Sequence, residues 1–141
     1  MKDGVQEILL VEDNPGDARL IRELLVDEIG RAAFSMQIAE SLEDALATLE
    51  SGLPDVVFLD LSLPDSFGLE TLYKLQSRAP ALPVIVLTGN EDQQLALSAV
   101  KAGAQDYMVK NDLSGRLLVK TMKYAQERKA IEASLRISEA R

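Results

Sequence analysis

The chain has 141 residues, 47% of them hydrophobic and 27% charged, which indicates one globular domain rather than a disordered segment. Cysteine and histidine are both absent, which excludes disulfides, thiolate or imidazole metal sites and histidine-based catalysis. Any chemistry must therefore depend on carboxylates, hydroxyls, amides and lysine, and any metal should be a hard cation bound by oxygen.

The charge is unevenly distributed along the chain. The net charge is -8, but residues 1–109 hold 7 basic and 19 acidic residues, whereas residues 110–141 hold 8 basic and 4 acidic ones. An acidic body repels the phosphate backbone of nucleic acids, so we expect no direct nucleic-acid binding. The basic end is interpreted as a solvated helix face, with binding of an acidic partner as the alternative.

The sequence contains no segment typical of a membrane or secreted protein. No apolar run reaches the length of about 18 residues that a membrane span needs. The N-terminus "MKDGVQEILLVED" lacks the apolar core and cleavage site of a signal peptide. We therefore expect a cytoplasmic protein that does not contact a membrane.

Short apolar runs alternate with stretches of helical periodicity. Asn14 before Pro15, Ser41 and Asn90 are typical N-caps, and glycines follow several of the predicted helices. The predicted strands are 7–12, 34–40, 55–60, 83–89 and 104–110. The predicted helices are 14–30, 41–52, 68–79, 90–103 and 112–141.

This alternation predicts a parallel sheet with helices on both faces. In such sheets ligands bind beyond the carboxyl ends of the strands, so the residues that end the strands are the candidates for a site. These residues are Glu12 with Asp13, Asp60, Thr88 with Gly89, and Lys110.

Three carboxylates that converge at one sheet edge need positive charge nearby. Lys110 supplies one charge, and Mg²⁺ suits the remaining need because the site offers oxygen ligands. A lysine, a hydroxyl and a metal beside an accessible carboxylate can hold a phosphoryl group. Asp60 would then be the nucleophile that forms an aspartyl phosphate.

Four motifs give the chain a family resemblance. They are "LLVEDNPGDARLI" (9–21), "DVVFLDLSLPDSFGLE" (55–70), "PVIVLTGN" (83–90) and "GAQDYMVK" (103–110), and together they span most of residues 5–126. In this order and spacing they resemble the receiver domain of two-component response regulators. The resemblance implies a flavodoxin-like (βα)5 three-layer sandwich, with a five-stranded parallel sheet of order 2-1-3-4-5 and here an extended C-terminal helix.

The resemblance implies a role for each matching residue. Asp60 matches the phosphoacceptor, and Glu12, Asp13 and Asp60 match the carboxylates that bind Mg²⁺, for which Mn²⁺ can substitute. The metal shell would be completed by the backbone carbonyl of Ser62. Thr88 and Lys110 match the residues that bind the phosphoryl group.

Further matching positions concern switching. Tyr107 matches the aromatic that turns inward when Thr88 moves. Ser62, Gly89 and Asn90 match positions that tune access to the phosphoryl group and its lifetime. By this resemblance the domain is not an enzyme with an external substrate but a regulator that catalyses its own phosphorylation and dephosphorylation, and its partner is a sensor histidine kinase or phosphotransfer protein.

One residue departs from the family pattern. The family usually has a proline after the lysine, joined by a cis bond, whereas Asn111 follows Lys110 here. A cis bond before a residue other than proline costs about 3–4 kcal/mol. We therefore expect a trans bond, or a cis bond held by local packing.

The C-terminal region is too long to be only the last helix of such a domain. Residues 1–126 are assigned to the receiver domain, with Leu117, Leu118, Met122 and Ala125 packed on the sheet. Residues 127–141 should project and resemble a signalling-helix linker to an output domain; a stand-alone receiver with a frayed tail is the alternative. The 3-4 spacing of Tyr124, Arg128, Ile131, Leu135 and Ser138 is an imperfect coiled-coil seam, through which a homodimer could form.

Three other functions are conceivable for such a chain. A phosphatase of the haloacid dehalogenase type requires a second acid two residues after the nucleophile, and Ser62 stands there. A flavodoxin requires a phosphate loop rich in hydroxyls and glycine, and "VEDNPGD" is acidic instead. A receiver fold that acts as an interaction module without phosphorylation stays open as the alternative.

Overall fold

The computed structural model describes residues 4–139, and their side chains up to residue 135. The main sheet consists of β1 (Gln6–Val11), β2 (Phe34–Ala39), β3 (Val56–Asp60), β6 (Val84–Thr88) and β7 (Asp106–Val109). The α-helices are α1 (Pro15–Ile29), α2 (Leu42–Glu50), α3 (Leu69–Arg78), α4 (Gln93–Lys101) and α5 (Gly115–Glu139). The shorter elements are the strands β4 (Ser62–Leu63) and β5 (Ser66–Phe67) and the 3-10 turns η1 (Arg31–Ala33), η2 (Asn90–Asp92) and η3 (Lys110–Asp112).

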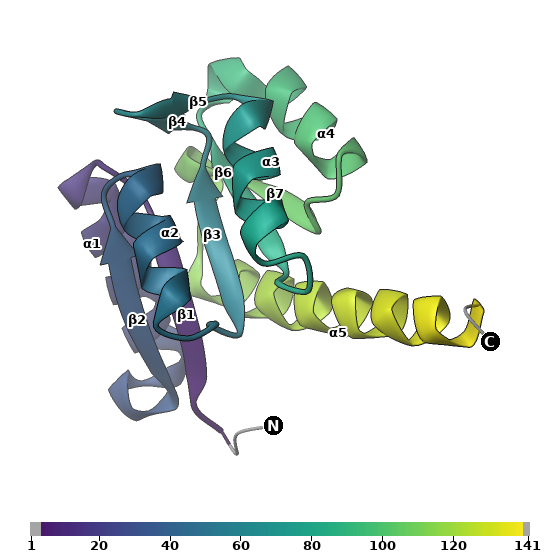
Figure 1. Ribbon diagram of the computed structural model, residues 1–141. Helices are drawn as coiled ribbons and strands as arrows, with labels where there is room; N and C mark the ends of the chain where they lie inside the picture. The colour runs from purple at the N-terminus through teal and green to yellow at the C-terminus, as the bar shows by residue number, and fades with distance from the viewer. Residues whose placement is uncertain (1–3, 140–141) are drawn as a thin grey trace.

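The sheet has the predicted topology. Its strand order is β2-β1-β3-β6-β7 and all neighbouring strands are parallel. Figure 1 shows the sheet between helices on its two faces, with α5 running past the edge where the strands begin. The flavodoxin-like (βα)5 arrangement with a long last helix is thereby confirmed.

Each face of the sheet carries its own core. Leu9 and Val11 of β1 face α2, α3 and α4, whereas Ile8 and Leu10 face α1 and α5. The central strand β3 is buried along its whole length. Because both faces are covered, the strands appear in the sequence as continuous apolar runs rather than as alternating patterns.

The predicted helix starts are correct for the first two helices. Asn14 caps α1 by accepting a hydrogen bond from the Asp17 amide at 3.0 Å. Ser41 caps α2 by accepting one from the Asp44 amide, also at 3.0 Å. The predicted start of the fourth helix was wrong, because Asn90 begins the 3-10 turn η2 and α4 starts only at Gln93.

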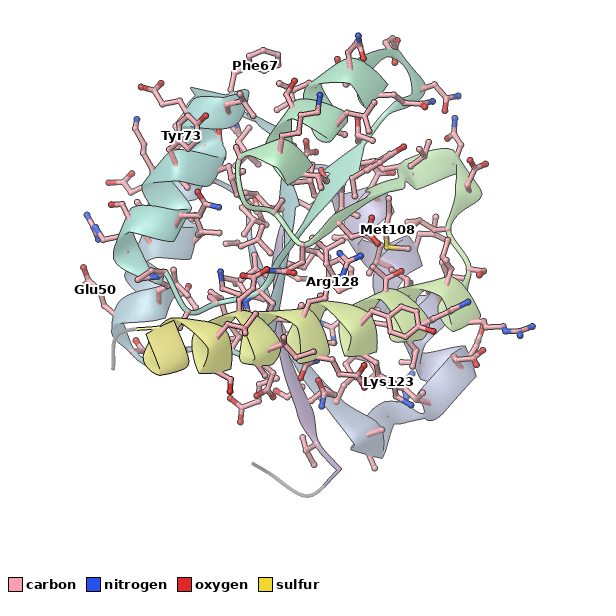
Figure 2. The ribbon with its side chains drawn as sticks, turned by 90° about the vertical axis from the view of Figure 1, so that its right-hand side faces the viewer. Glu50, Phe67, Tyr73, Met108, Lys123 and Arg128 are labelled. Carbon is pink, nitrogen blue, oxygen red and sulfur yellow. The ribbon has the colours of Figure 1, made fainter. Side chains whose placement is uncertain are left out.

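The last helix differs from the prediction at its start and in its packing. It begins at Gly115, after η3, rather than at residue 112. Leu118, Met122 and Ala125 are buried as predicted, but Leu117 is exposed. Beyond residue 126 the helix still contacts the body, because Arg128 Nη1 donates to the Gln105 carbonyl at 2.6 Å. Figure 2 shows Arg128 directed from α5 toward the sheet.

The helices also bear on membrane association. None of those between residues 4 and 139 combines the length and apolar character that crossing a bilayer would require.

Candidate functional site

Glu12 follows β1 and is a buried carboxylate. The residue is only 1% exposed, its amide continues the ladder by donating to the Ala39 carbonyl at 2.9 Å, and Oε2 accepts from the Asn14 amide at 3.2 Å. Burial raises the pKa of Glu12 to about 7, with repulsion from Asp60 in the same direction and Lys110 partly opposing both. Such a carboxylate is kept ionised at neutral pH only with the help of nearby positive charge.

Asp60 is the last residue of β3 and is held on both oxygens. Oδ1 accepts a hydrogen bond from the Ser62 amide at 2.8 Å, and Oδ2 accepts one from Lys110 Nζ at 2.8 Å. The residue is 8% exposed, so that the carboxylate reaches the surface from a strand that is otherwise buried. The short hairpin of β4 and β5, which the sequence did not predict, supplies the Ser62 amide.

Lys110 follows β7 and is the cation of the site. Its Nζ lies 2.6 Å from Glu12 Oε1, 2.8 Å from Asp60 Oδ2 and 3.1 Å from Asp17 Oδ2. Burial works to lower the pKa of Lys110, but its hydrogen bonds to Asp60 and Glu12 outweigh this and raise it. Lys110 therefore stays charged.

The peptide bond after Lys110 is trans. No cis bond occurs between residues 4 and 139, as expected from Asn111 in place of proline. Lys110 begins η3, and its side chain still reaches the carboxylates of Glu12 and Asp60. Lys110 therefore reaches these carboxylates although Asn111 replaces the family's proline.

Asp17 was not predicted from the sequence. It lies in the first turn of α1, four residues after Asp13, and its side chain is 37% exposed. A helix that starts directly after a strand brings its first turn back over the strand's end, so an acid at this spacing is the signal that could have identified it.

The acidic cluster fits a divalent cation. Glu12, Asp13 and Asp60 each offer a carboxylate oxygen within 4.8 Å of the other two. With Asp17, the site holds four carboxylates and one ammonium group, so it has an excess of negative charge. An all-oxygen donor set with exposed Asp13 at its rim suits Mg²⁺ or Mn²⁺.

Thr88 lies beside Asp60 at the end of the neighbouring strand β6. It is buried, its Oγ1 donates to the Gly89 carbonyl at 3.0 Å, and it lines with Asp60 a small recess that Phe67 and Asp92 border. The structure thus brings Thr88 and Asp60 together, as the positions at the strand ends predict.

The remaining predicted residues lie at different depths, and only Ser62 among them lines this recess. Ser62 is exposed in β4, Gly89 is half-buried, and exposed Asn90 begins η2. Tyr107 in β7 pairs in register with Val86 and packs, half-buried, against the core on the α2–α4 face. The roles assigned to these residues in tuning and switching stay predictions.

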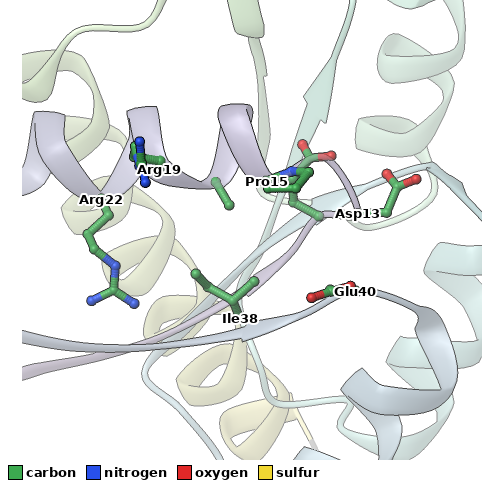
Figure 3. A pocket seen from close by; sticks show the side chains of 8 residues that line it. Asp13, Pro15, Arg19, Arg22, Ile38 and Glu40 are labelled. Atoms are coloured by element: carbon green, nitrogen blue, oxygen red, sulfur yellow. The ribbon is translucent and has the colours of Figure 1, made fainter.

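A pocket of about 320 Å³ borders the acidic cluster (Figure 3). Arg19 and Arg22 of α1 form one wall, and Ile38 and Glu40 at the end of β2 form the other. Asp13 belongs to the acidic cluster and also lines this pocket. The surface beside the cluster is therefore hollowed and has both acidic and basic side chains. No pattern in the sequence predicted this pocket.

The comparisons with known proteins agree with this geometry. The response regulator receiver domain family matches residues 8–122. The virulence transcriptional regulatory protein PhoP of Shigella flexneri is 37% identical over 103 residues, which are 73% of this chain and 44% of that protein. The alginate biosynthesis transcriptional regulatory protein AlgB of Pseudomonas putida is 33% identical over 127 residues, 90% of this chain and 28% of that protein.

Solved structures show the same likeness. The receiver domain of NtrX from Brucella abortus superposes with a TM-score of 0.75 at 30% identity, covering 85% of this chain and 98% of that domain. The longer NtrX chain superposes with a TM-score of 0.80 at 28% identity, covering 97% of this chain and 30% of that one. The chain thus spans less than half the length of these regulators, but it belongs to the response regulator receiver domain family.

Proposed function

We propose that this receiver domain accepts a phosphoryl group on Asp60 from the phosphohistidine of a sensor histidine kinase or phosphotransfer protein. The observation that carries the proposal is the placement of Asp60, which lies 2.8 Å from the Lys110 ammonium and offers a carboxylate oxygen within 4.8 Å of those of Glu12 and Asp13. Bound by Glu12, Asp13, Asp60 and the Ser62 carbonyl, Mg²⁺ or Mn²⁺ would neutralise charge on the transferring group.

In this reaction an Asp60 oxygen bonds to phosphorus while the bond from phosphorus to the imidazole nitrogen breaks, and its electron pair stays with the imidazole. Lys110 already contacts Asp60 and would bind an oxygen of the transferred group. Thr88 would give up its bond to the Gly89 carbonyl to bind another oxygen. Tyr107, half-buried beside this strand, would fill the space that Thr88 leaves.

The domain is proposed to act as a cytoplasmic regulator rather than as an enzyme with an external substrate. The switch of Thr88 and Tyr107 would change the surface near α4, β7 and α5, and α5 would pass this change to an attached output domain or a partner. Exposed apolar residues on α5, among them Ile131 and Leu135, make a second copy of the chain a fitting partner.

The test is intact-protein mass spectrometry after incubation with Mg²⁺ and acetyl phosphate. The wild type should gain one phosphate, which Asp60→Asn and removal of Mg²⁺ should both abolish. Asp27→Asn, which removes an exposed acid on the far part of α1, should be phosphorylated like the wild type. If Asp60→Asn gained phosphate as the wild type does, the assignment of Asp60 would be wrong. If the wild type gained none and did not respond to beryllofluoride, the fold would serve as an interaction module that works without phosphorylation.

A further inference from the structure

Asp17 is a fourth carboxylate at the site, and the reaction proposed above does not use it. Its Oδ2 accepts a hydrogen bond from Lys110 Nζ at 3.1 Å. The two residues are 93 positions apart in the sequence, so the contact depends on the fold. Asp17 therefore bears directly on the lysine that would bind the phosphoryl group.

Lys110 is shared among three carboxylates. Its Nζ donates hydrogen bonds to Asp60 at 2.8 Å and to Asp17 at 3.1 Å, and it lies 2.6 Å from Glu12 Oε1. A phosphoryl oxygen that binds Lys110 must therefore compete with these carboxylates for the ammonium group. The question is which carboxylate yields.

The structure points to Asp17 as the carboxylate that yields. Its contact is the longest of the three, and its side chain is 37% exposed, against 0% for Glu12 and 11% for Asp60. Water competes best for exposed charges, so this ion pair is the weakest of the three. Removing Lys110 from Glu12 would instead leave a fully buried carboxylate without its cation.

Asp17 is also fixed in place. Its amide is bound by the Asn14 cap at 3.0 Å, and it lies in the first turn of α1, where the helix dipole favours a negative charge. The backbone of Asp17 is thus held beside the site, and from there its carboxylate reaches Lys110 in the resting state.

We propose that Asp17 is a positioning residue that holds Lys110 at rest and is displaced when a phosphoryl group binds at Asp60. This inference rests on the proposed phosphorylation of Asp60. Asp17 then has two opposite effects: its competition for Lys110 slows phosphorylation, whereas its negative charge strengthens binding of the divalent cation. Removing the charge should separate these effects.

The experiment compares Asp17→Asn with the wild type in two measurements. At saturating Mg²⁺, phosphorylation by acetyl phosphate should be about two- to five-fold faster, the range expected for loss of a partly exposed ion pair. By calorimetry without phosphodonor, Mg²⁺ binding should be weaker by a similar factor. Asp17→Glu, which keeps the charge, should return both values toward those of the wild type.

The control is Asp27→Asn, which removes one charge from the same helix ten residues further on, about 15 Å away. At this distance salt screens most of its influence, so both measurements should match the wild type. Damage to the fold would lower the rate and the affinity together, so faster phosphorylation cannot be explained in that way.

Two results overturn the inference. If Asp17→Asn is phosphorylated at the wild-type rate, or more slowly, Asp17 does not hold Lys110 back. If the wild type takes up no phosphate at all, the proposed function fails and the role of Asp17 falls with it. If the wild type is phosphorylated, only the role of Asp17 can have failed; if it is not, the proposed function itself has failed.

Discussion

At the scale of single residues, the carboxylates of Glu12, Asp13 and Asp60 repel one another, because each offers an oxygen within 4.8 Å of the others. Asp13 is the exposed member, so its charge can be removed without opening the core. We expect Asp13→Asn to raise the free energy of unfolding without Mg²⁺ by about 1 kcal/mol, since it relieves repulsion near the surface. The same change should remove the stabilisation that Mg²⁺ gives the wild type.

Urea unfolding with and without Mg²⁺ measures both parts of this prediction. Asp27→Asn should leave both the Mg²⁺-free stability and the effect of Mg²⁺ as in the wild type, because it lies away from the cluster. A destabilised Asp13→Asn would contradict repulsion within the cluster, and a variant that Mg²⁺ still stabilises fully would show that the cluster is not the metal site.

At the scale of the elements, helix α2 is capped from two places. The Ser41 hydroxyl accepts from the Asp44 amide, and the Asp65 carboxylate accepts from the Leu42 and Glu43 amides, both at 2.9 Å. Asp65 precedes the short strand β5, so it joins the hairpin beside Asp60 to the start of α2. The hydrogen bonds that the two backbone amides donate lower the pKa of Asp65.

The Asp65 cap makes the stability of α2 dependent on pH. Because the pKa of Asp65 is lowered in the folded state, the ionised side chain stabilises the fold at pH values above 3.8, the pKa in the unfolded chain. This stabilisation is lost as the pH falls through the lower pKa of the folded state. Asp65→Ala should cost about 1 kcal/mol at neutral pH, and less in acid. Ser41→Ala removes a neutral cap, so its cost should not change with pH in the same way. Urea unfolding at pH about 7 and about 3 compares the two variants; equal pH dependence would contradict the role of the Asp65 charge.

The elements also show what the sequence could predict. Continuous apolar runs such as 55–60 and caps such as Asn14 are local signals, and they predicted the parallel sheet and the edge of the site correctly, whereas the correct strand order came from the family resemblance. The spacing of Asp17 after Asp13 is a local signal for its place near the site, but the partners in the contacts of Asp17 with Lys110 and of Asp65 with α2 are far apart in the chain, and no local pattern encodes them. The hairpin of β4 and β5 has two-residue strands, which are too short to show a period.

At the scale of the whole molecule, α5 is fastened to the body beyond the predicted domain boundary at residue 126. The buried Gln105 donates from its side chain to the Glu132 carboxylate at 3.3 Å, and its carbonyl accepts from Arg128. Gln126 donates to the Gln6 side chain at 2.7 Å on the other side. Assignment of residues 127–141 to a projecting linker stays a prediction, and Arg128 faces the body rather than the predicted coiled-coil seam.

Three other seam residues, Tyr124, Ile131 and Leu135, lie on one exposed face of α5. Leu117, which was predicted to pack on the sheet, is exposed on the same face: it precedes Tyr124 by seven residues, as Tyr124 precedes Ile131, and Leu135 is four further on, so that all four fall within a narrow stripe. Ile131 and Leu135 are 59% and 57% exposed, and they lie past the part of the helix that covers the sheet. Ser138 lies outside the residues whose side chains are described. A second copy of this chain would offer the same stripe, which gives the self-complementary contact of a twofold dimer.

We therefore expect the wild type with Mg²⁺ and beryllofluoride to form dimers in sedimentation velocity, in proportions that rise with concentration. Ile131→Glu combined with Leu135→Glu should keep it monomeric, because charges in the stripe would face each other in the dimer. Ala133→Glu adds a charge at an exposed position on the opposite side of the same helix and should still allow dimers. If Ala133→Glu dissociates the dimer as well, or if the double variant still dimerises, the contact lies on another face, and α5 would carry the signal to an output domain without self-association.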